Sequence, residues 1–395
     1  MISCVGTNRM LGGELQVYGL KRVECAIYRG GTSRGVFLHA DDVPKDSEAQ
    51  DQLALALMGS PDVRQIDGLG GATSHTSKVV IMSRSAHQEA DVDYNFLQVA
   101  IDRSVVDHGG MCGNLLSAAG LFAVDEGLVK IQEPVTVVRI RNVNTDKFFR
   151  VHIPVNEGQS VVLGDYTIAG VAKAGAYIRN DFLDPGGSVT GKLLPTGNPC
   201  DEIEVDGTPF RISLVDASNP LAIAQLSDFG LNGDEPLQQL NSDSDLLTLF
   251  ENVRAECAYH LGFVQDKGRA AVDSPALPRL CVVGSPIEYR TLSGTPVSRS
   301  QQDLTCRLVS MQKVHQSIAV TGAVCLGTAV LIEGTVPNRL MPSGAPGERL
   351  RIGHPSGVME VEAAGRIEEG PQFRGYVSLG RTARRLMDGF AYVPE

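Results

Sequence analysis

The segment around Cys112 brings together residue types that proton transfer needs. Gly109 and Gly110 precede the thiol, and Asn114 follows it at the expected start of an apolar helix. Backbone N–H groups at a helix N-terminus have no partner within the helix, so they can bind a carboxylate or stabilise a thiolate. We therefore predict that Cys112 donates or accepts a proton. The alternative is a small buried cysteine at a helix start, which the flanking glycines and the cap-like Asn114 disfavour.

A lysine is the best candidate for the partner of this thiol. Lys78 lies where the small polar loop of residues 70–77 meets the strand-like run of residues 79–82. Burial or a neighbouring cation at such a junction lowers the pKa of a lysine from ~10.4 towards neutrality and makes it a usable base. The alternatives are a lysine that only neutralises a substrate carboxylate, or a solvated one. His75 is the second candidate for the base.

Two turns have the composition of anion-binding loops. Residues 28–35 read Tyr-Arg-Gly-Gly-Thr-Ser-Arg-Gly, in which glycines and hydroxyls can form an anion nest and Arg29 and Arg34 can each fork onto a carboxylate. The segment is not a P-loop or a Rossmann fingerprint, because the Gly-Lys-Ser/Thr ending and a third glycine opening a helix are missing. The similar turn at residues 216–220 would face it from the other half of the chain, with His315 on the same rim.

The elements that must hold these residues are mostly short strands. Strand-like runs at residues 23–28 and 35–38 flank the first turn, residues 78–82 form another, and residues 135–140 and 148–155 read as a hairpin.

Helices are fewer. Asp46–Met58 and Asp245–Leu261 are amphipathic, whereas Asn114–Val124 and Gly322–Ile332 are apolar nearly all round and should be buried.

The two apolar helices reveal an internal repeat. Residues 112–120 match residues 319–327, and both helices are followed by a Glu-Gly pair in which glycine would be the C-cap. Residues 32–38 likewise match residues 218–224, in the same order. We therefore predict an α+β fold of two pseudo-repeated domains, each a curved, mostly antiparallel sheet around a buried helix, with chance similarity as the alternative. The predicted domains are residues 1–185, to which the C-terminal tail may return, and residues 186–395, with the active site in the cleft between them.

Composition narrows the class of protein. The net charge of −11 argues against nucleic acid or an anionic membrane as a partner, though not against a small anionic substrate. The eight cysteines show no CxxC spacing, and neither a signal peptide nor a membrane-spanning apolar stretch is visible. We expect a cytoplasmic protein that needs no metal or organic cofactor.

Several segments taken together resemble the PrpF-type proteins. They are residues 28–35, residues 67–78, Gly110-Met111-Cys112-Gly113-Asn114 and residues 313–316. That family includes 2-methylaconitate cis–trans isomerase and related methylitaconate, oxalomesaconate and aconitate isomerases, and the resemblance runs from about residue 20 to the C-terminus. It implies the diaminopimelate epimerase fold group, in which two cysteines commonly form the acid/base pair. The PrpF proteins differ from that group in lacking the two-cysteine pair, and this chain accordingly has Ala319 at the position matched to Cys112. The resemblance implies catalytic roles for Lys78 and Cys112.

The expected reaction moves a proton, and with it a double bond, on a small unsaturated polycarboxylic acid. Removing a proton beside a carboxylate and a C=C bond gives a delocalised anion, which cationic and N–H donors stabilise. We assign Lys78 as the main base and Cys112 as the partner acid. The expected substrate-binding residues are Thr32, Ser33, Arg34, Ser77, Gly113, Asn114, Asn219, His315, Thr321 and Gly322.

Three other readings stay open. An amino-acid epimerase of the same fold would need a second thiol in the cleft, for which Cys306 and Cys325 are candidates. A non-catalytic small-acid-binding protein and a redox sensor built on Cys112 are the others. The sequence leaves the exact substrate undecided, and a homodimer is possible.

Overall fold

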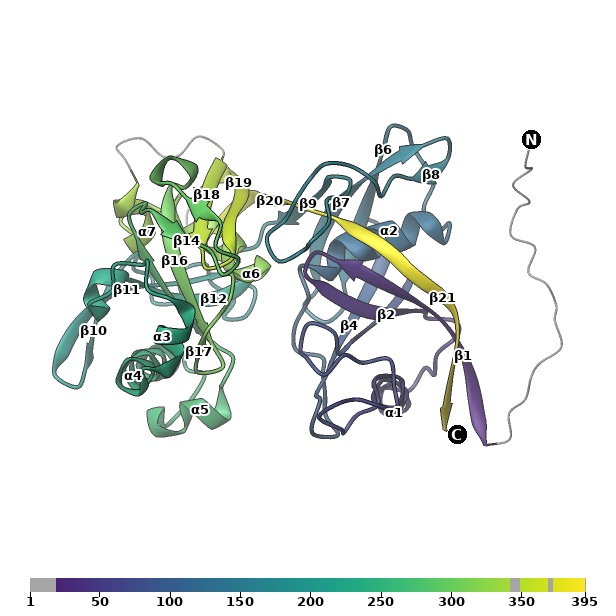
Figure 1. The fold of residues 1–395 in the computed structure, drawn as a ribbon, viewed down its shortest axis with the longest axis horizontal. Coiled ribbons are helices and arrows are strands. Elements are labelled where there is room, and N and C mark those ends of the chain that lie inside the picture. Colours follow the sequence, from purple (N-terminus) through teal and green to yellow (C-terminus); the bar gives the residue numbers. More distant parts are fainter. Residues whose placement is uncertain (1–18, 342–348, 369–371, 395) are drawn as a thin grey trace.

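The computed structural model describes residues 19–341, 349–368 and 372–394. Figure 1 shows two halves side by side, each built mainly of strands around one central helix. The first half contains β1 (Leu20–Gly30), β2 (Ser33–His39), α1 (Ser47–Met58), β3 (Lys78–Arg84), β4 (Val92–Val99), β5 (Val106–Asp107), α2 (Leu115–Asp125), β6 (Val135–Asn142), β7 (Lys147–Asn156), β8 (Gln159–Ser160) and β9 (Ile178–Leu183).

The second half repeats this plan with more helices. Its strands are β10 (Asp201–Val205), β11 (Thr208–Ala217), β12 (Asn219–Gln225), β13 (Arg279–Gly284), β14 (Tyr289–Arg290), β15 (Pro296–Val297), β16 (Leu304–Ser310), β17 (Lys313–Val314), β18 (Arg349–His354), β19 (Gly357–Glu368) and β20 (Gln372–Arg381). Its α-helices are α3 (Leu237–Ser242), α4 (Ser244–His260), α5 (Ala270–Asp273), α6 (Val320–Ala329) and α7 (Val336–Leu340), and the 3-10 turns are η1 (Leu226–Phe229), η2 (Lys267–Arg269) and η3 (Arg299–Gln301). β21 (Ala383–Pro394) ends the chain.

The strand pairing confirms the internal repeat. In the first half, β2 runs parallel to β3, β3 antiparallel to β4, β4 parallel to β6, and β6 antiparallel to β7. The second half has the same sequence of pairings from β12 through β13, β16 and β18 to β19. Two domains with the same alternation of parallel and antiparallel neighbours form one α+β fold, as predicted.

The curved sheet of each half encloses one buried, mostly apolar helix. All residues of α2 from Leu115 to Val124, and all residues of α6, are buried. α2 contacts β1, β6 and β7, while α6 contacts β11, β12 and β19. A helix that is apolar on nearly every side is stable only when its whole surface is removed from water, and the curved sheet provides this burial.

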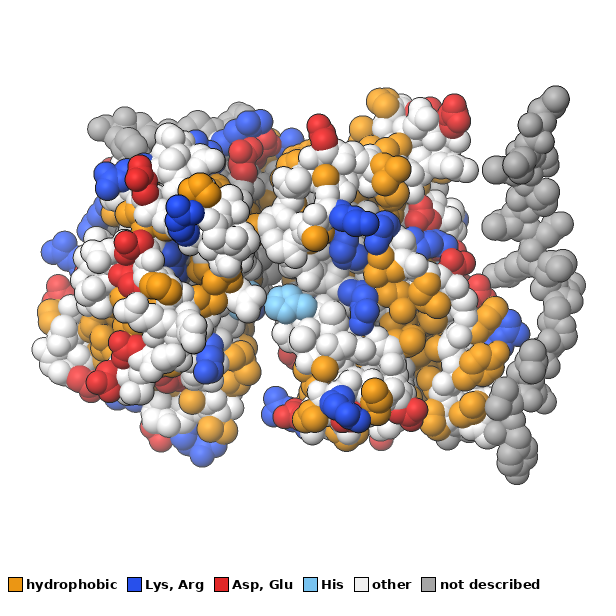
Figure 2. Space-filling view, in the orientation of Figure 1, with side chains coloured by type: hydrophobic (Ala, Val, Ile, Leu, Met, Phe, Trp, Pro, Cys, Tyr) orange, Lys and Arg blue, Asp and Glu red, His pale blue; other side chains and the backbone are white. Residues whose placement is uncertain are grey.

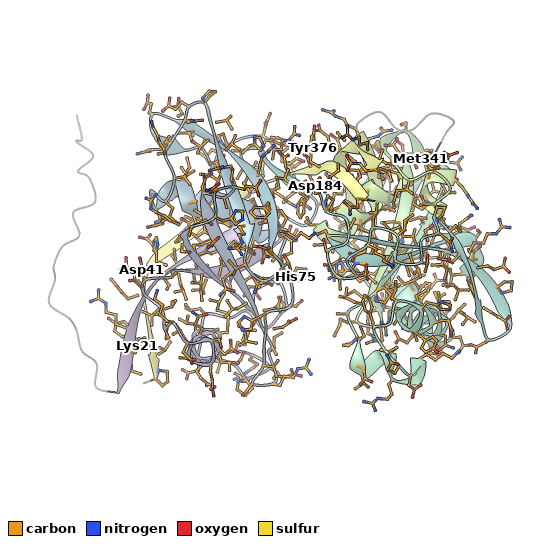
Figure 3. The ribbon with its side chains drawn as sticks, turned by 180° about the vertical axis from the view of Figure 1, so that it is seen from behind. Lys21, Asp41, His75, Asp184, Met341 and Tyr376 are labelled. Carbon is orange, nitrogen blue, oxygen red and sulfur yellow. The ribbon has the colours of Figure 1, made fainter. Side chains whose placement is uncertain are left out.

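Two strand pairings connect the halves. β9 of the first half pairs with β20 of the second, and Figure 3 shows Asp184 and Tyr376 close together at this junction. β20 leads into β21, which pairs antiparallel with β1 along its whole length, from Leu20 opposite Pro394 to Gly30 opposite Ala383. The C-terminal strand therefore lies in the sheet of the first half, and Figure 1 shows it crossing over in yellow.

The predicted helix ends are partly wrong. α2 stops as expected, because Gly127 after the C-cap residue Glu126 adopts a left-handed φ of 65°. α6 instead begins at Val320 and ends at Ala329, before the second Glu-Gly pair. The physical reason is Thr335, whose hydroxyl donates to the Ala329 carbonyl at 2.7 Å and so satisfies the helix end without a glycine cap.

Within residues 19–341, 349–368 and 372–394, no helix is both long and apolar enough to cross a membrane.

Candidate active site

The two buried helices meet end to end between the domains. A β-carbon on Gly113, just before α2, would lie 2.6 Å from Cγ1 of Val320, the first residue of α6. This contact explains why glycine is needed at position 113. The two helix N-termini therefore lie together, and their partial positive charges favour an anion at this place.

Lys78 is buried at the start of β3. Its side chain is only 7% exposed, Nζ donates to Oε1 of Gln98, and the Phe96 ring centroid lies 5.0 Å from Nζ. Burial lowers the pKa of Lys78, and the nearby Arg279 lowers it further, whereas Cys112 acts in the opposite direction. The direction of this shift agrees with the expectation from the sequence, and Lys78 shares its surroundings with Cys112 and with a residue of the second domain.

Cys112 lies two residues before the N-cap position of α2 and is partly exposed. Its Sγ is 3.7 Å from the Ser33 hydroxyl, and the Tyr94 hydroxyl donates to its carbonyl at 3.4 Å. The thiol therefore lies between the β1–β2 turn and the start of the buried helix. This places one predicted substrate-binding hydroxyl beside one predicted acid.

The Asn114 side chain does not have the helix-capping role that the sequence suggests. Its side chain makes no capping hydrogen bond to α2. Instead Nδ2 donates to the Thr32 hydroxyl at 3.1 Å, and Oδ1 accepts from Nε of Arg381 at 3.1 Å. The amide thus ties the hydroxyl-bearing turn to the helix start and leaves the N–H groups of the helix free of a side-chain cap.

Two histidines face each other between the domains. The rings of His75 and His315 have centroids 5.9 Å apart. Burial lowers the pKa of both, and for His75 the charge of Lys78 adds to the effect. Both rings are therefore favoured in the neutral form. Figure 3 labels His75 on the side of the first domain that faces the second, and Figure 2 shows the groove between them.

Comparison with known proteins identifies the family of the chain. The family described as PrpF protein matches residues 20–394. The chain belongs to the PrpF family.

Relatives with assigned reactions cover nearly the whole PrpF chain. It is 41% identical to 3-methylitaconate isomerase of Eubacterium barkeri, over 95% of this chain and 98% of that one. It is 38% identical to 2-methyl-aconitate isomerase of Shewanella oneidensis, over 95% and 97% of the two chains. These relatives support an isomerase.

Solved structures agree on the fold. A crystal structure of methylitaconate-delta-isomerase matches with a TM-score of 0.85 and 40% identity, covering 95% of this chain and 96% of that one. A hydroxyproline epimerase from Agrobacterium vitis matches with a TM-score of 0.53 at 10% identity, over 95% and 93% of the chains, which shows a shared fold alone. The PrpF chain therefore has the two-domain epimerase-like fold.

Two arginines of this PrpF chain were missed by sequence reasoning. Arg279, the first residue of β13, donates from Nη1 to the Thr321 hydroxyl at 3.1 Å, and its Nε has no partner among the described residues. The sequence could have marked Arg279, because it directly precedes an apolar, strand-like run, as Lys78 does. Arg381 is 5% exposed and bonds to Asn114, to the Gly380 carbonyl and to a methionine sulfur, but its strand gave no pattern that marks it.

The remaining predicted substrate-binding residues do not all lie close to Lys78 and Cys112. The Ser77 hydroxyl is fully buried, donates to the Val99 carbonyl at 2.9 Å and accepts from Gln65 at 2.7 Å, so its hydrogen bonds are made within the protein.

Nη2 of Arg34 is 3.4 Å from the Leu69 carbonyl. Asn219 opens β12 and is partly exposed, and Gly322 is buried in the first turn of α6. The structure therefore groups the Thr32, Ser33 and Asn114 side chains with the reactive pair and turns the Ser77 side chain away from it.

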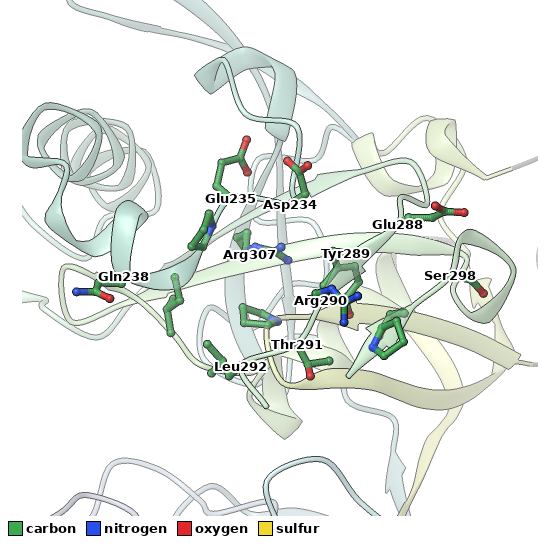
Figure 4. Close-up of a pocket in the computed structure, with 15 residues that line it drawn as sticks. Asp234, Glu235, Gln238, Glu288, Tyr289, Arg290, Thr291, Leu292, Ser298 and Arg307 are labelled. Carbon is green, nitrogen blue, oxygen red and sulfur yellow. The ribbon is translucent and has the colours of Figure 1, made fainter. Parts of the chain in front are cut away.

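A separate cavity of about 920 Å³ opens in the second domain (Figure 4). It is lined by Asp234, Glu235, Glu288, Tyr289, Arg290 and Arg307, among others, and by neither Lys78 nor Cys112. We place the candidate active site at the lysine and the thiol, because reactive groups rather than volume decide where proton transfer can occur.

Proposed function

We propose that this protein is a cofactor-independent isomerase that moves a proton, and with it a double bond, on a small unsaturated di- or tricarboxylic acid. The observation that carries the proposal is a buried lysine with a lowered pKa, within electrostatic reach of a thiol that lies where two helix N-termini meet. A neutral amine can accept a proton from carbon, and the helix N-termini favour the negative charge that results.

In the proposed reaction, neutral Lys78 removes a proton from the carbon beside a carboxylate and the C=C bond. The electron pair of the C–H bond stays on the substrate as a delocalised, enolate-like anion. Helix N–H groups and the Arg279 guanidinium stabilise this anion. The Cys112 thiol then gives a proton to the allylic carbon, and the double bond moves. Proton exchange between the two residues restores the starting state.

We propose that the substrate belongs to the 2-methylaconitate, aconitate or methylitaconate type. The support is the pair of relatives that act on 3-methylitaconate and 2-methyl-aconitate. The proposed carboxylate-binding groups are Thr32, Ser33, Arg34, Gly113, Asn114, Asn219, Arg279, His315, Thr321 and Gly322. We also propose that the domains divide near residue 185, with the site in the cleft between them. A cytoplasmic location and a homodimer remain predictions.

An amino-acid epimerase is the less favoured function. It would need a second acid of the Cys112 kind on the opposite face of the substrate. Cys306 and Cys325 are fully buried in the core of the second domain, and Ala319 is the N-cap residue of α6. No feature of the described residues points to a second thiol in the cleft.

The deciding experiment is proton NMR of the enzyme in D₂O with 2-methylaconitate, cis-aconitate, trans-aconitate and 3-methylitaconate offered separately. We expect deuterium to replace an allylic or vinylic proton of at least one acid, and no exchange with the Lys78→Ala protein. Activity should persist in excess EDTA. Loss of activity with EDTA and its return with one metal would contradict cofactor independence, and absence of exchange with every acid would favour a binding protein.

A further inference from the structure

The residue paired with Lys78 across the sheet carries an amide. Lys78 and Gln98 are direct partners in the antiparallel pair of β3 and β4, so their side chains stand on the same face of the sheet. The lysine Nζ donates to Gln98 Oε1. The group that holds the proposed base is therefore a neutral acceptor.

The orientation of this amide is fixed by its other contacts. Gln98 Nε2 donates to the Ser77 carbonyl at 2.9 Å and to the Ser74 carbonyl at 3.3 Å. Carbonyl oxygens only accept, so the NH₂ group must face the backbone of the loop and Oε1 must face Lys78. Because this loop leads directly into Lys78, Gln98 links the base to the backbone that positions it.

The charged groups around Lys78 explain why it matters that the acceptor is neutral. The titratable and charged groups that act on the lysine or feel its charge are His75 in the preceding loop, Cys112 before α2 and Arg279 on β13. The two charged groups that shift the pKa of the lysine, Cys112 and Arg279, include no carboxylate. The ring of Phe96 supplies an uncharged wall on β4. A carboxylate in place of the amide would bring an opposite charge to a buried amine and stabilise its protonated form.

We propose that Gln98 is a positioning residue for the base, which aims Nζ of Lys78 while supplying a neutral acceptor in place of an anionic one. This inference rests on the proposed function, in which Lys78 removes the proton. The neutral amine donates one N–H to Gln98 and keeps its lone pair for the proton on carbon. After the transfer, the ammonium group still donates to the same oxygen, so the contact serves both protonation states.

The test compares three substitutions. Gln98→Glu keeps the shape and adds a charge, Gln98→Leu removes the acceptor without adding charge, and Gln98→Asn keeps the amide but shortens its reach. The protein carries lysine labelled with ¹³C at Cε, and the Lys78 signal is identified by its loss in Lys78→Arg. The signal is followed by NMR as a function of pH, without substrate, alongside kcat/KM for the most active acid of the panel.

We expect the Lys78 midpoint in Gln98→Glu to lie at least one pH unit above that of the unmodified protein, and the midpoint in Gln98→Leu not to rise. The kcat/KM of Gln98→Glu at neutral pH should fall at least tenfold and recover as the pH rises. Gln98→Leu and Gln98→Asn should lose kcat at every pH. An unshifted midpoint in folded Gln98→Glu, or unchanged kcat in Gln98→Asn, would overturn the inference. A shifted midpoint without turnover of any acid would support the inference on Gln98 and contradict the proposed function alone.

Discussion

Lys78 and Arg279 occupy equivalent positions in the two domains. Lys78 is the first residue of β3, which runs parallel to β2, and Arg279 is the first residue of β13, which runs parallel to β12. Each parallel partner follows the polar turn of its own domain. The fold repeat therefore brings the proposed base from one domain and an arginine from the other to the same site, where the arginine lowers the pKa of the lysine.

Replacing either member of the reactive pair should stop turnover without unfolding the protein. We expect Lys78→Ala and Cys112→Ser each to reduce kcat by roughly 10²–10⁴-fold, the usual contribution of one general acid or base. Activity and thermal unfolding would be measured together. Cys200→Ser is the matched control, because Cys200 is partly exposed like Cys112 but lies in the second domain. Wild-type turnover by Cys112→Ser would refute its role as the partner acid.

The pH profile should report the titration of Lys78. A base must be neutral to accept a proton, so kcat/KM should rise with pH through the pKa of the lysine. Because burial and Arg279 lower that pKa, the midpoint should lie below the ordinary lysine value of 10.5. Lys78→Ala should abolish this ascending limb. A limb that is unchanged in a residually active Lys78→Ala protein would assign the base to another group, such as His75.

The charge of Arg279 should contribute to turnover and to the pH profile. Arg279→Gln removes a cation that binds Thr321 and lowers the pKa of Lys78. We expect kcat/KM to fall about 10–100-fold, as for loss of one charge-assisted contact of about 1.5–3 kcal/mol, and the ascending limb to move to higher pH. Arg279→Lys should restore part of the activity. Arg290→Gln, on the short strand β14, is the control that should behave as wild type.

The close approach of the two helices gives a steric prediction. Gly113→Ala should be harmful, because the added carbon would lie 2.6 Å from Val320 Cγ1. Overpacking of this kind costs about 1–3 kcal/mol, and it should also lower activity by moving the helix starts apart. Gly110→Ala is the control, since a β-carbon there meets nothing within 4 Å. Rescue of Gly113→Ala by Val320→Ala, seen in unfolding and in turnover, would confirm the contact.

Much of the architecture was determined by local sequence. The strands around the first polar turn, the hairpin of β6 and β7, and the helices α1 and α4 all follow from short-range periodicity and side-chain caps. Asp46 and Asp243, for example, accept hydrogen bonds from the backbone N–H groups of α1 and α4. The two helices without a polar face predicted their own burial, and the order of the matched segments predicted the repeat.

The candidate site was determined by sequence only in part. Cys112 and Lys78 could be singled out because glycines, a helix start and a loop-to-strand junction mark them locally. The surroundings of these residues come from distant parts of the chain, and so only the tertiary structure decided them. Gln98 meets Lys78 through strand register, Arg279 arrives from the other domain, and Arg381 reaches Asn114 through a strand 267 residues further along the chain. Periodicity specifies which face of an element is buried, whereas the partner of a buried polar group depends on how the elements are packed.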